Sequence, residues 1–452
     1  MLLAIVIVFV IGYMAIAFEH QLKVDKTASA LLLGMLLWTM YAVGVLDGNV
    51  FPDINMEIVN ESMIEQMGDI SEILFFLVGA MTIVELIDVH GGFSVITDKI
   101  TTRKRGKLMW LLCFVTFFMS AILDNLTTAI VMVMLLRKLI RNSRERWLFG
   151  SMIIIAANSG GAWSPIGDIT TIMLWVRGNV TTEGIVTSIF LPSLVSMIVP
   201  LAIASRVLKG EMTSMPENVS GNDGFITSSD KKRIFAFGVL ALILVPVFKS
   251  FTHLPPFIGV LFTLSILWIY TEFFYNGKKV EMDKQHRIPK ILHKIDISTI
   301  LFFLGILLAV AVLQVTGILG GLAIYLDENV HNVYIINLVL GALSSVVDNV
   351  PLVAAAMGMY PIVDPALLVT MPHEEALYMA NFVQDGIFWK FLSYCAGVGG
   401  SMLIIGSAAG VVVMGLERIN FVWYFKKISF LALLGYLSGA AVYILEVWLC
   451  EM

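Results

Sequence analysis

Apolar runs long enough to cross a lipid bilayer recur along the chain and constrain its fold more than any other feature. The first, LLAIVIVFVIGYMAIAF at residues 2–18, carries no charge. Only α-helices and closed β-barrels satisfy their backbone hydrogen bonds in lipid, and barrel strands alternate apolar with polar residues. These runs are continuous, and 58% of the 452 residues are apolar while only 14% are charged. The sequence therefore predicts an all-α polytopic membrane protein.

We predict about ten full spans. They lie near residues 2–18, 29–46, 71–87, 148–176, 184–208, 233–249, 255–275, 297–315, 386–415 and 428–447. Lys and Arg favour cytoplasmic loops. The basic segments 99–107, 137–146 and 276–294 are therefore expected in the cytoplasm. Segments 47–69 and 360–385 are acidic and contain no Lys or Arg, so they are expected outside.

Two further apolar stretches do not fit as straight spans. Stretch 108–136 has basic segments on both sides, so it is expected to enter and leave on the cytoplasmic face. This pattern predicts a re-entrant hairpin with two arms of roughly 13 residues and a tip near Asp124-Asn125. Stretch 334–359 has non-basic flanks, which predicts a second hairpin that enters from outside, with its tip near Asp348-Asn349.

Three blocks of sequence recur in the same order. Residues 69–77 and 296–304 share eight of nine residues, and both hairpin tips read Asp-Asn. The pattern Gly160-Gly161…Gly167-Asp168 is echoed by Gly399-Gly400…Gly406-Ser407. Because the loop charges orient the two copies oppositely, we predict an inverted repeat. The alternative is chance similarity between apolar sequences. The predicted regions are 1–68 (N-terminal spans and an extracytoplasmic loop), 69–208 (first repeat), 209–295 (connection with two spans) and 296–447 (second repeat).

Helix-breaking residues interrupt spans 148–176 and 386–415. They are Gly160, Gly161, Pro165 and Gly167 in the first span, and Gly399, Gly400 and Gly406 in the second. Glycine permits non-helical backbone and proline lacks a donor, so both helices are expected to be discontinuous. Free backbone groups at bilayer depth are tolerated where they line a cavity or bind a ligand. Close helix packing is the alternative explanation for the glycines.

Polar residues gather around these tips and breaks. An aspartate at the bilayer centre costs at least ~2.5–3.5 kcal/mol, so its presence indicates function. Carboxylate, amide and hydroxyl oxygens suit a small hard cation, and one carboxylate holds either a proton or a cation. The candidate cation- and proton-binding residues are Asp124, Asn125, Thr127, Thr128, Asn158, Ser159, Asp168, Ser344, Asp348, Asn349, Ser401 and Ser407. The alternative for each aspartate is a structural hydrogen bond to a free helix end. Asp168 has no acidic counterpart, so a titrating site and a helix-terminus partner stay equally open for it.

Three weaker signals concern residues near the ends of helices. Asp69 and Asp296 precede predicted spans and are expected to be helix N-caps. His90 lies near a basic connection, where a solvated side chain is expected and a pH-sensing role is the alternative.

The motifs Asp124-Asn-Leu-Thr-Thr, Asn158-Ser-Gly-Gly-Ala-Trp-Ser-Pro-Ile-Gly-Asp-Ile-Thr-Thr and Ser345-Val-Val-Asp-Asn-Val-Pro resemble bacterial sodium/proton antiporters of the NhaD type. That family belongs to the ion transporter superfamily, with arsenite permeases and dicarboxylate transporters. The resemblance covers about residues 69–447. It implies electrogenic exchange of Na+ or Li+ for H+, a homodimer in the bacterial inner membrane, and an elevator-like motion. It also implies Na+ binding through Asp124, Asn125, Asp348 and Asn349. Neither a cofactor nor a nucleic-acid partner is expected.

Two other functions compete with exchange of cations. An arsenite or dicarboxylate carrier would share the architecture, but the dicarboxylate branch carries Ser-Asn-Thr at the hairpin tips. Two Asp-Asn tips would repel an anion. An intramembrane aspartyl protease is the remote alternative, and the chain lacks the Gly-x-Gly-Asp pattern of such enzymes. The sequence therefore predicts a secondary transporter rather than an enzyme.

Overall fold

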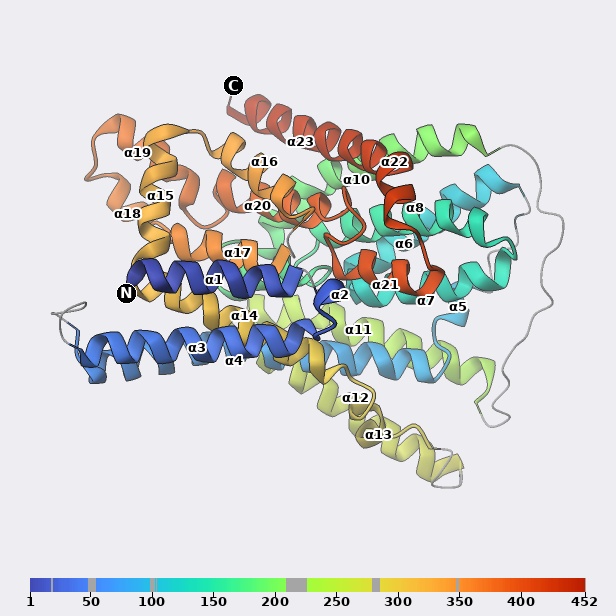
Figure 1. Cartoon of the computed structure of the whole chain (residues 1–452). Helices are drawn as coiled ribbons and strands as arrows, with labels where there is room; N and C mark the ends of the chain where they lie inside the picture. Colours follow the sequence, from blue (N-terminus) through green and yellow to red (C-terminus); the bar gives the residue numbers. More distant parts are fainter. Residues whose placement is uncertain are drawn as a thin grey trace.

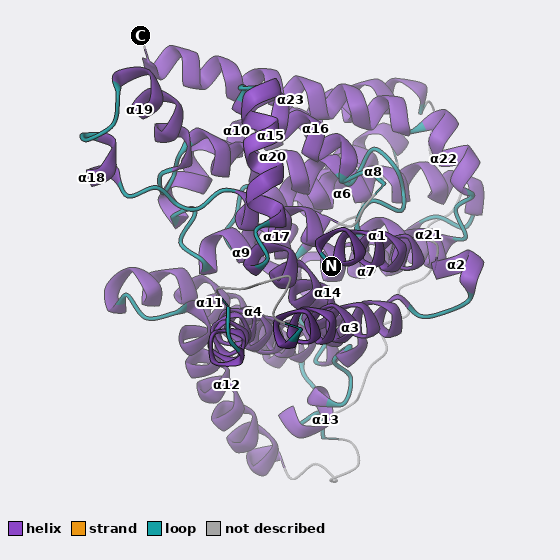
Figure 2. Ribbon diagram, turned by 60° about the vertical axis from the view of Figure 1, so that its left-hand side comes forward, coloured by secondary structure: helices purple, strands orange, loops and turns teal. Residues whose placement is uncertain are grey.

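The computed structural model describes residues 1–17, 19–47, 54–97, 102, 104–208, 226–278, 285–346 and 349–451, and in these residues every regular element is a helix (Figures 1 and 2). The predicted all-α fold is confirmed. The longer helices are α1 (Leu2–Ala17), α3 (Lys26–Leu46), α4 (Met56–Val89), α6 (Arg105–Leu123), α7 (Asn125–Leu139), α8 (Ser143–Ala162), α10 (Thr182–Val207), α11 (Ser228–Thr252), α12 (Pro256–Lys278), α14 (Ile297–Val315), α20 (Ile387–Gly399) and α23 (Ser429–Glu451).

Shorter helices connect or complete these elements. They are α2 (Glu19–Leu22), α5 (Ser94–Thr97), α9 (Ile169–Val176), α13 (Ile288–Leu292), α15 (Ile318–Asn329), α16 (Val333–Leu343), α17 (Asn349–Met359), α18 (Pro365–Leu368), α19 (His373–Met379), the 3-10 helix η2 (Ala380–Phe382), α21 (Ala408–Glu417) and α22 (Phe421–Lys427).

In the described part of the chain, eight helices are long and apolar enough to cross a membrane, or nine if α21 and α22 form one span bent by 116°. This count of eight or nine compares with about ten predicted full spans, two of which were predicted to be discontinuous. Runs 148–176 and 386–415 each divide into two helices, and α1 has only 16 residues. Conversely, α6 has 19 residues and is one of the eight membrane-length helices. The predicted re-entrant hairpin called for an arm of only roughly 13 residues there.

Side-chain caps fix where several helices begin. Asp25 accepts a hydrogen bond from the Thr27 amide at 2.7 Å at the start of α3, and Asn142 accepts from the amides that open α8. Thr227 and Asp230 form a reciprocal capping box at the start of α11. Such caps satisfy amide groups that have no partner within the helix, so they separate helices from loops even inside apolar sequence.

The helices pack in two layers, which we call the lower layer and the upper layer after their positions in Figure 2. The lower layer comprises α3, α4, α11, α12 and α14, which pack against one another, and α1 packs onto α3 from above. The upper layer comprises α6 to α10, α16, α17, α20, α21 and α23. Helices α14 and α17 make the main packing between the layers.

Within the lower layer, α3 and α14 approach backbone to backbone. A Cβ atom on Gly34 would lie 2.5 Å from the carbonyl oxygen of Gly305, and one on Gly305 would lie 2.5 Å from the Ala30 carbonyl carbon. Nearby, the Trp38 indole donates to the Leu308 carbonyl at 3.1 Å. Residues from the N-terminal region are therefore an integral part of this layer.

Both ends of stretch 108–136 lie at the same end of the molecule, because Arg105 at the start of α6 forms an ion pair with Glu145 at the start of α8, at 2.7 Å. Helices α6 and α7 meet at Asp124. In the second stretch, the Tyr360 hydroxyl after α17 donates to Asp327 before α16, at 3.1 Å. Figure 1 shows α5 at one end of the bundle and α18 and α19 at the opposite end.

Two expectations about helix ends need correction. Asp69 is not an N-cap, because α4 begins at Met56 and Asp69 lies within the helix. Its carboxylate pairs with Arg177. Asp296 is the N-cap of α14, as expected, and accepts from Thr299.

The expectation of a solvated histidine is wrong for His90, whose side chain is 1% exposed. Its Nδ1 lies 2.8 Å from the Leu86 carbonyl, which can only accept, so Nδ1 donates. Its Nε2 lies 2.6 Å from the Tyr275 hydroxyl and accepts. Burial lowers the pKa of His90 to about 4, and the ring is therefore neutral near pH 7.

Candidate functional site

The structure interrupts both glycine-rich runs. Between α8 and α9, a Cβ atom on Gly167 would lie 2.7 Å from the Ser120 carbonyl oxygen. Between α20 and α21, a Cβ atom on Gly406 would lie 2.5 Å from the Ser345 carbonyl oxygen. A side chain would not fit at either position. Glycine therefore lets each interruption lie directly against the backbone that precedes a predicted hairpin tip. Of the other predicted breakers, Pro165 and Gly400 lie in the interruptions. Gly160, Gly161 and Gly399 are still helical, in the last turns of α8 and α20, and Gly160 and Gly399 pack closely against neighbouring backbone instead.

Two serines bind these elements together in the same way. The Ser120 hydroxyl on α6 donates to the Ala157 carbonyl of α8 at 2.6 Å. The Ser344 hydroxyl after α16 donates to the Ala396 carbonyl of α20 at 2.9 Å. The Ser344 hydroxyl, a candidate ligand in the sequence, thus holds a helix in place.

Asp168 is the point on which the site converges. It is 1% exposed and is the N-cap of α9, where its Oδ1 accepts from the amide and the hydroxyl of Thr170, both at 3.0 Å. The Asn125 amide donates to its Oδ2 at 2.9 Å. The Asn349 amide lies 3.4 and 3.5 Å from the two oxygens. Polar groups from both predicted tips thus surround one carboxylate, which the N-terminus of α9 also favours as an anion.

Asn158 joins the two interruptions. Its side chain is fully buried, and its amide nitrogen lies 2.9 Å from both the Ser401 and the Ser407 hydroxyls. Its amide oxygen accepts from Asn125 at 3.2 Å. A continuous chain of hydrogen bonds therefore runs from Asp168 through two asparagines to the second break.

Asp124 lies in a different setting from Asp168. Its carboxylate accepts from the Thr127 amide at 2.7 Å and the Thr127 hydroxyl at 2.9 Å. It lines a cavity of about 40 Å³ between the layers, together with Leu77 and Thr299 of the lower layer. Its φ of +88° is a backbone conformation that non-glycine residues rarely adopt.

The remaining candidates divide between the site and its surroundings. The Thr128 hydroxyl is buried and has no hydrogen-bond partner among the described residues. The Ser159 hydroxyl accepts from Ser196 of α10 at 2.8 Å and so belongs to helix packing. Asp348 lies outside the described residues. Thr170 was not among the predicted site residues. Its position two residues after an aspartate is typical of the first turn after a helix N-cap, and this signal could have identified it.

A larger cavity of about 180 Å³ lies between α4 and α14 of the lower layer and α9 and α17 of the upper layer. Its polar lining includes Gln66, Arg177, Asn179 and Gln314. Nearby, contacts cross between the layers: Arg177 pairs with Asp69, and the Lys249 ammonium lies 4.5 Å above the Trp175 ring. The end of α9 distant from Asp168 is therefore held by the lower layer.

A bundle of membrane-length helices, with two interrupted helices around a buried carboxylate, defines a membrane transport protein. The comparisons agree. A family model described as "Citrate transporter" matches residues 13–381, and the chain belongs to this transporter family.

Curated relatives at higher identity carry the name of antiporters. "Sodium/proton antiporter 1" of Arabidopsis thaliana is 44% identical over 98% of this chain and 72% of its own length. "Sodium/proton antiporter 2" of the same plant is 43% identical over 97% of this chain and 98% of its own length. "Na(+)/H(+) antiporter NhaD" of Vibrio cholerae is 29% identical over 98% and 91%. The predicted resemblance is confirmed, and the chain is a transporter rather than an enzyme.

Proposed function

We propose that this protein exchanges Na+ or Li+ for H+ across its membrane. The single observation that carries the proposal is the convergence of Asn125 and Asn349 on the buried carboxylate of Asp168. The names of the relatives support the choice of ions. Seen together, the buried carboxylate supplies charge, and the neutral groups around it supply the oxygens that a small hard cation needs.

The site chemistry allows the two ions to compete. An asparagine amide carries both donors and an acceptor, so Asn125 can donate to the carboxylate in one state and turn its oxygen to a cation in another. A proton on Asp168 removes the charge that holds a cation, whereas a bound cation favours the ionised carboxylate. The unpaired Thr128 hydroxyl, buried one turn into α7, supplies a further oxygen.

Asp124 and Asp348 complete the proposed set of exchanging carboxylates. The rare backbone conformation at Asp124 supports a functional role, because such conformations cluster at functional sites. Asp124 also faces the boundary between the layers, where ions would enter or leave.

We also propose the inverted repeat, the two re-entrant hairpins and an elevator-type motion. The parallel Ser120 and Ser344 hydrogen bonds, and the glycine contacts at both breaks, support the repeat. In the motion, the upper layer would move past the lower layer, and the Arg177–Asp69 ion pair would have to open. The homodimer stays a prediction. So does the bacterial inner membrane, since the relatives at 43 and 44% identity are plant proteins.

The test is dissipation of an imposed ΔpH in everted vesicles that contain the protein. Addition of Na+ or Li+, but not K+, is expected to dissipate the gradient, and vesicles without the protein are the control. No response to Na+ and Li+ between about pH 7 and pH 9, where a buried carboxyl group can still take up and release a proton, would contradict the proposal.

The family description makes an organic anion the second candidate substrate. The buried carboxylate at the centre of the site disfavours it, because it would repel a citrate-like anion. Uptake of radiolabelled citrate into the same vesicles, with no response to Na+ as coupling or exchanged ion, would favour this second candidate.

A further inference from the structure

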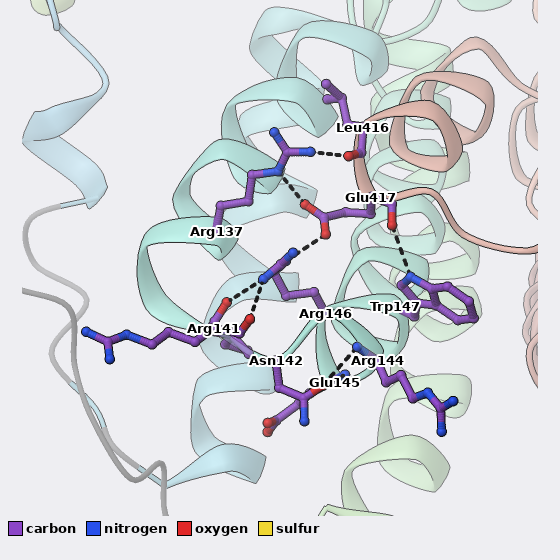
Figure 3. Close-up of polar contacts among 10 residues, drawn as sticks. Arg137, Arg141, Asn142, Arg144, Glu145, Arg146, Trp147, Leu416 and Glu417 are labelled. Atoms are coloured by element: carbon purple, nitrogen blue, oxygen red, sulfur yellow. Dashed lines mark hydrogen bonds and ion pairs between the residues drawn. The ribbon is translucent and has the colours of Figure 1, made fainter.

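A second buried carboxylate lies at the far end of the upper layer from Asp168. The Glu417 side chain is 0% exposed and ends α21. Its Oε1 accepts from Arg137 Nε and its Oε2 from Arg146 Nε, both at 2.6 Å (Figure 3). Each carboxylate oxygen therefore holds one guanidinium group. Charge-assisted hydrogen bonds of this kind are about twice as strong as neutral ones.

The backbone at the end of α21 is held by the same neighbours. Arg137 also donates to the Leu416 carbonyl, and the Trp147 indole donates to the Glu417 carbonyl at 3.0 Å. Carbonyls in the last turn of a helix have no partner within the helix. Residues of α7 and α8 thus cap α21, although 270 to 280 residues separate them in sequence.

Three helices meet at Glu417, and the same three carry polar residues of the ion site. Helix α7 begins at Asn125, α8 contains Asn158, and α21 follows its N-cap Ser407. These three residues are hydrogen-bonded in series, at 3.2 and 2.9 Å. At 1.5 Å per residue, the ion pairs lie roughly 15–20 Å along the helices from those hydrogen bonds. The three-helix unit is therefore joined at both of its ends.

The contacts at Glu417 fix how far α7, α8 and α21 can slide along their own axes. A helix that slides or rotates there carries its site residue with it, because a helix is stiff over two to four turns. Breaking a buried ion pair leaves uncompensated charges, so the local arrangement must shift when the carboxylate is lost.

We infer that Glu417 is a positioning residue for the ion site, which keeps Asn125, Asn158 and Ser407 at the spacing that binds the transported cation. This inference rests on the proposed cation exchange. A role confined to folding would lower the amount of protein and leave the affinity unchanged. A positioning role changes the affinity itself, and changes it differently for Na+ and Li+.

The test is the variant Glu417→Gln, which keeps the size of the side chain and removes its charge. Dissipation of ΔpH in proteoliposomes is measured against Na+ and Li+ concentration, with rates normalised to the amount of folded protein. The expected result is a rise in the half-saturating Na+ concentration of about tenfold, since small displacements at a site have large effects. A change in the ratio of the Na+ and Li+ values is expected, with a maximal rate within about twofold of the wild type.

The matched control is Glu272→Gln, which removes the carboxylate from an ion pair with Arg287 in the lower layer. It is expected to leave both half-saturating concentrations unchanged. If Glu417→Gln fails to fold, the variant Arg137→Gln replaces it in the same assay. The Arg137 side chain is 44% exposed, and its loss still leaves Arg146 paired with the carboxylate.

The outcomes separate the two proposals. Wild-type protein that does not respond to Na+ or Li+ would overturn the proposed function. A wild-type response, with unchanged half-saturating concentrations in Glu417→Gln or in its substitute Arg137→Gln, would overturn the positioning role alone.

Discussion

The two interrupted helices restart with the same backbone conformation but with different chemistry. Asp168 has φ and ψ of −144° and 144°, Ser407 has −143° and 152°, and each is the N-cap of the half-helix that follows. Glycines press each break against a neighbouring backbone in the same way. The first break carries a carboxylate and the second a hydroxyl. Two interruptions with matching backbone conformations at their N-caps therefore differ in charge, and the difference lies in the single side chains Asp168 and Ser407.

The strongest test of this asymmetry removes the carboxylate. Asp168→Asn keeps the shape of the side chain but leaves the first break as neutral as the second. Exchange of Na+ for H+ is expected to fall about 100-fold or more, because the charge that holds the cation is lost. The measurement is dissipation of ΔpH in everted vesicles at matched expression. Exchange at more than half of the wild-type rate would show that the carboxylate of the first break is dispensable.

The shared framework is tested by adding a methyl group to equivalent glycines. In Gly160→Ala the new Cβ would overlap the Phe117 carbonyl oxygen, and in Gly399→Ala it would overlap that of Gly341. Each change is expected to destabilise the protein by about 1–3 kcal/mol. Thermal unfolding in detergent measures both, and the control Gly415→Ala has nothing within 4 Å of the new atom. Loss of stability in only one of the pair would break the structural equivalence.

A smaller effect on exchange is expected from a change at the second interruption, which carries no charge. Ser407→Ala removes a helix N-cap and an acceptor for Asn158. Loss of the cap is expected to cost about 1 kcal/mol. If this cost destabilises only the Na+-bound state, the half-saturating Na+ concentration rises roughly fivefold. Titration of exchange with Na+ measures it. The control Ser438→Ala removes a hydroxyl that bonds to its own helix, and an equal rise there would contradict the assignment.

The smallest effect on exchange is expected at His90, which follows α4 in the lower layer and contacts Tyr275 and Leu86 rather than either break. Since burial lowers its pKa to about 4, the ring is neutral throughout the working range. His90→Gln is therefore expected to leave the pH dependence of exchange unchanged between about pH 7 and pH 9. A shifted pH midpoint would instead place part of the proton response outside the interrupted helices.

The same pKa predicts how stability depends on pH. The unfolded chain binds a proton at His90 more readily than the folded protein, so wild-type stability should fall as pH falls from about 6.5 towards 4. His90→Gln should reduce that dependence, as measured by thermal unfolding at a series of pH values.

Local signals in the sequence predicted the fold and part of the site. Glycine and proline inside apolar runs located both interruptions, and Asp124 lies at the junction of α6 and α7, where a tip was expected. These signals need only a few consecutive residues. The start of α4 was missed because an acidic segment was interpreted as a loop, whereas Asn55 caps a helix of 34 residues there.

The arrangement around Asp168 could not be predicted in the same way. Its partners Asn125 and Asn349 lie 43 and 181 residues away, so only the packing of whole helices brings them together. Glu417 gave no signal either, since its ion pair with Arg137 spans 280 residues and a glutamate after an apolar run is ordinarily solvated.

The contact between Gly34 and Gly305 also has a consequence for how the protein is made. The partner of Gly34 is synthesised 271 residues later (305 − 34), which at 5–20 residues per second takes roughly 14–54 s. During that interval the face of α3 around Gly34 lacks its α14 partner. The lower layer therefore closes only after the second half of the chain emerges, and a nascent chain stalled before α14 would leave that face uncovered and prone to misassembly.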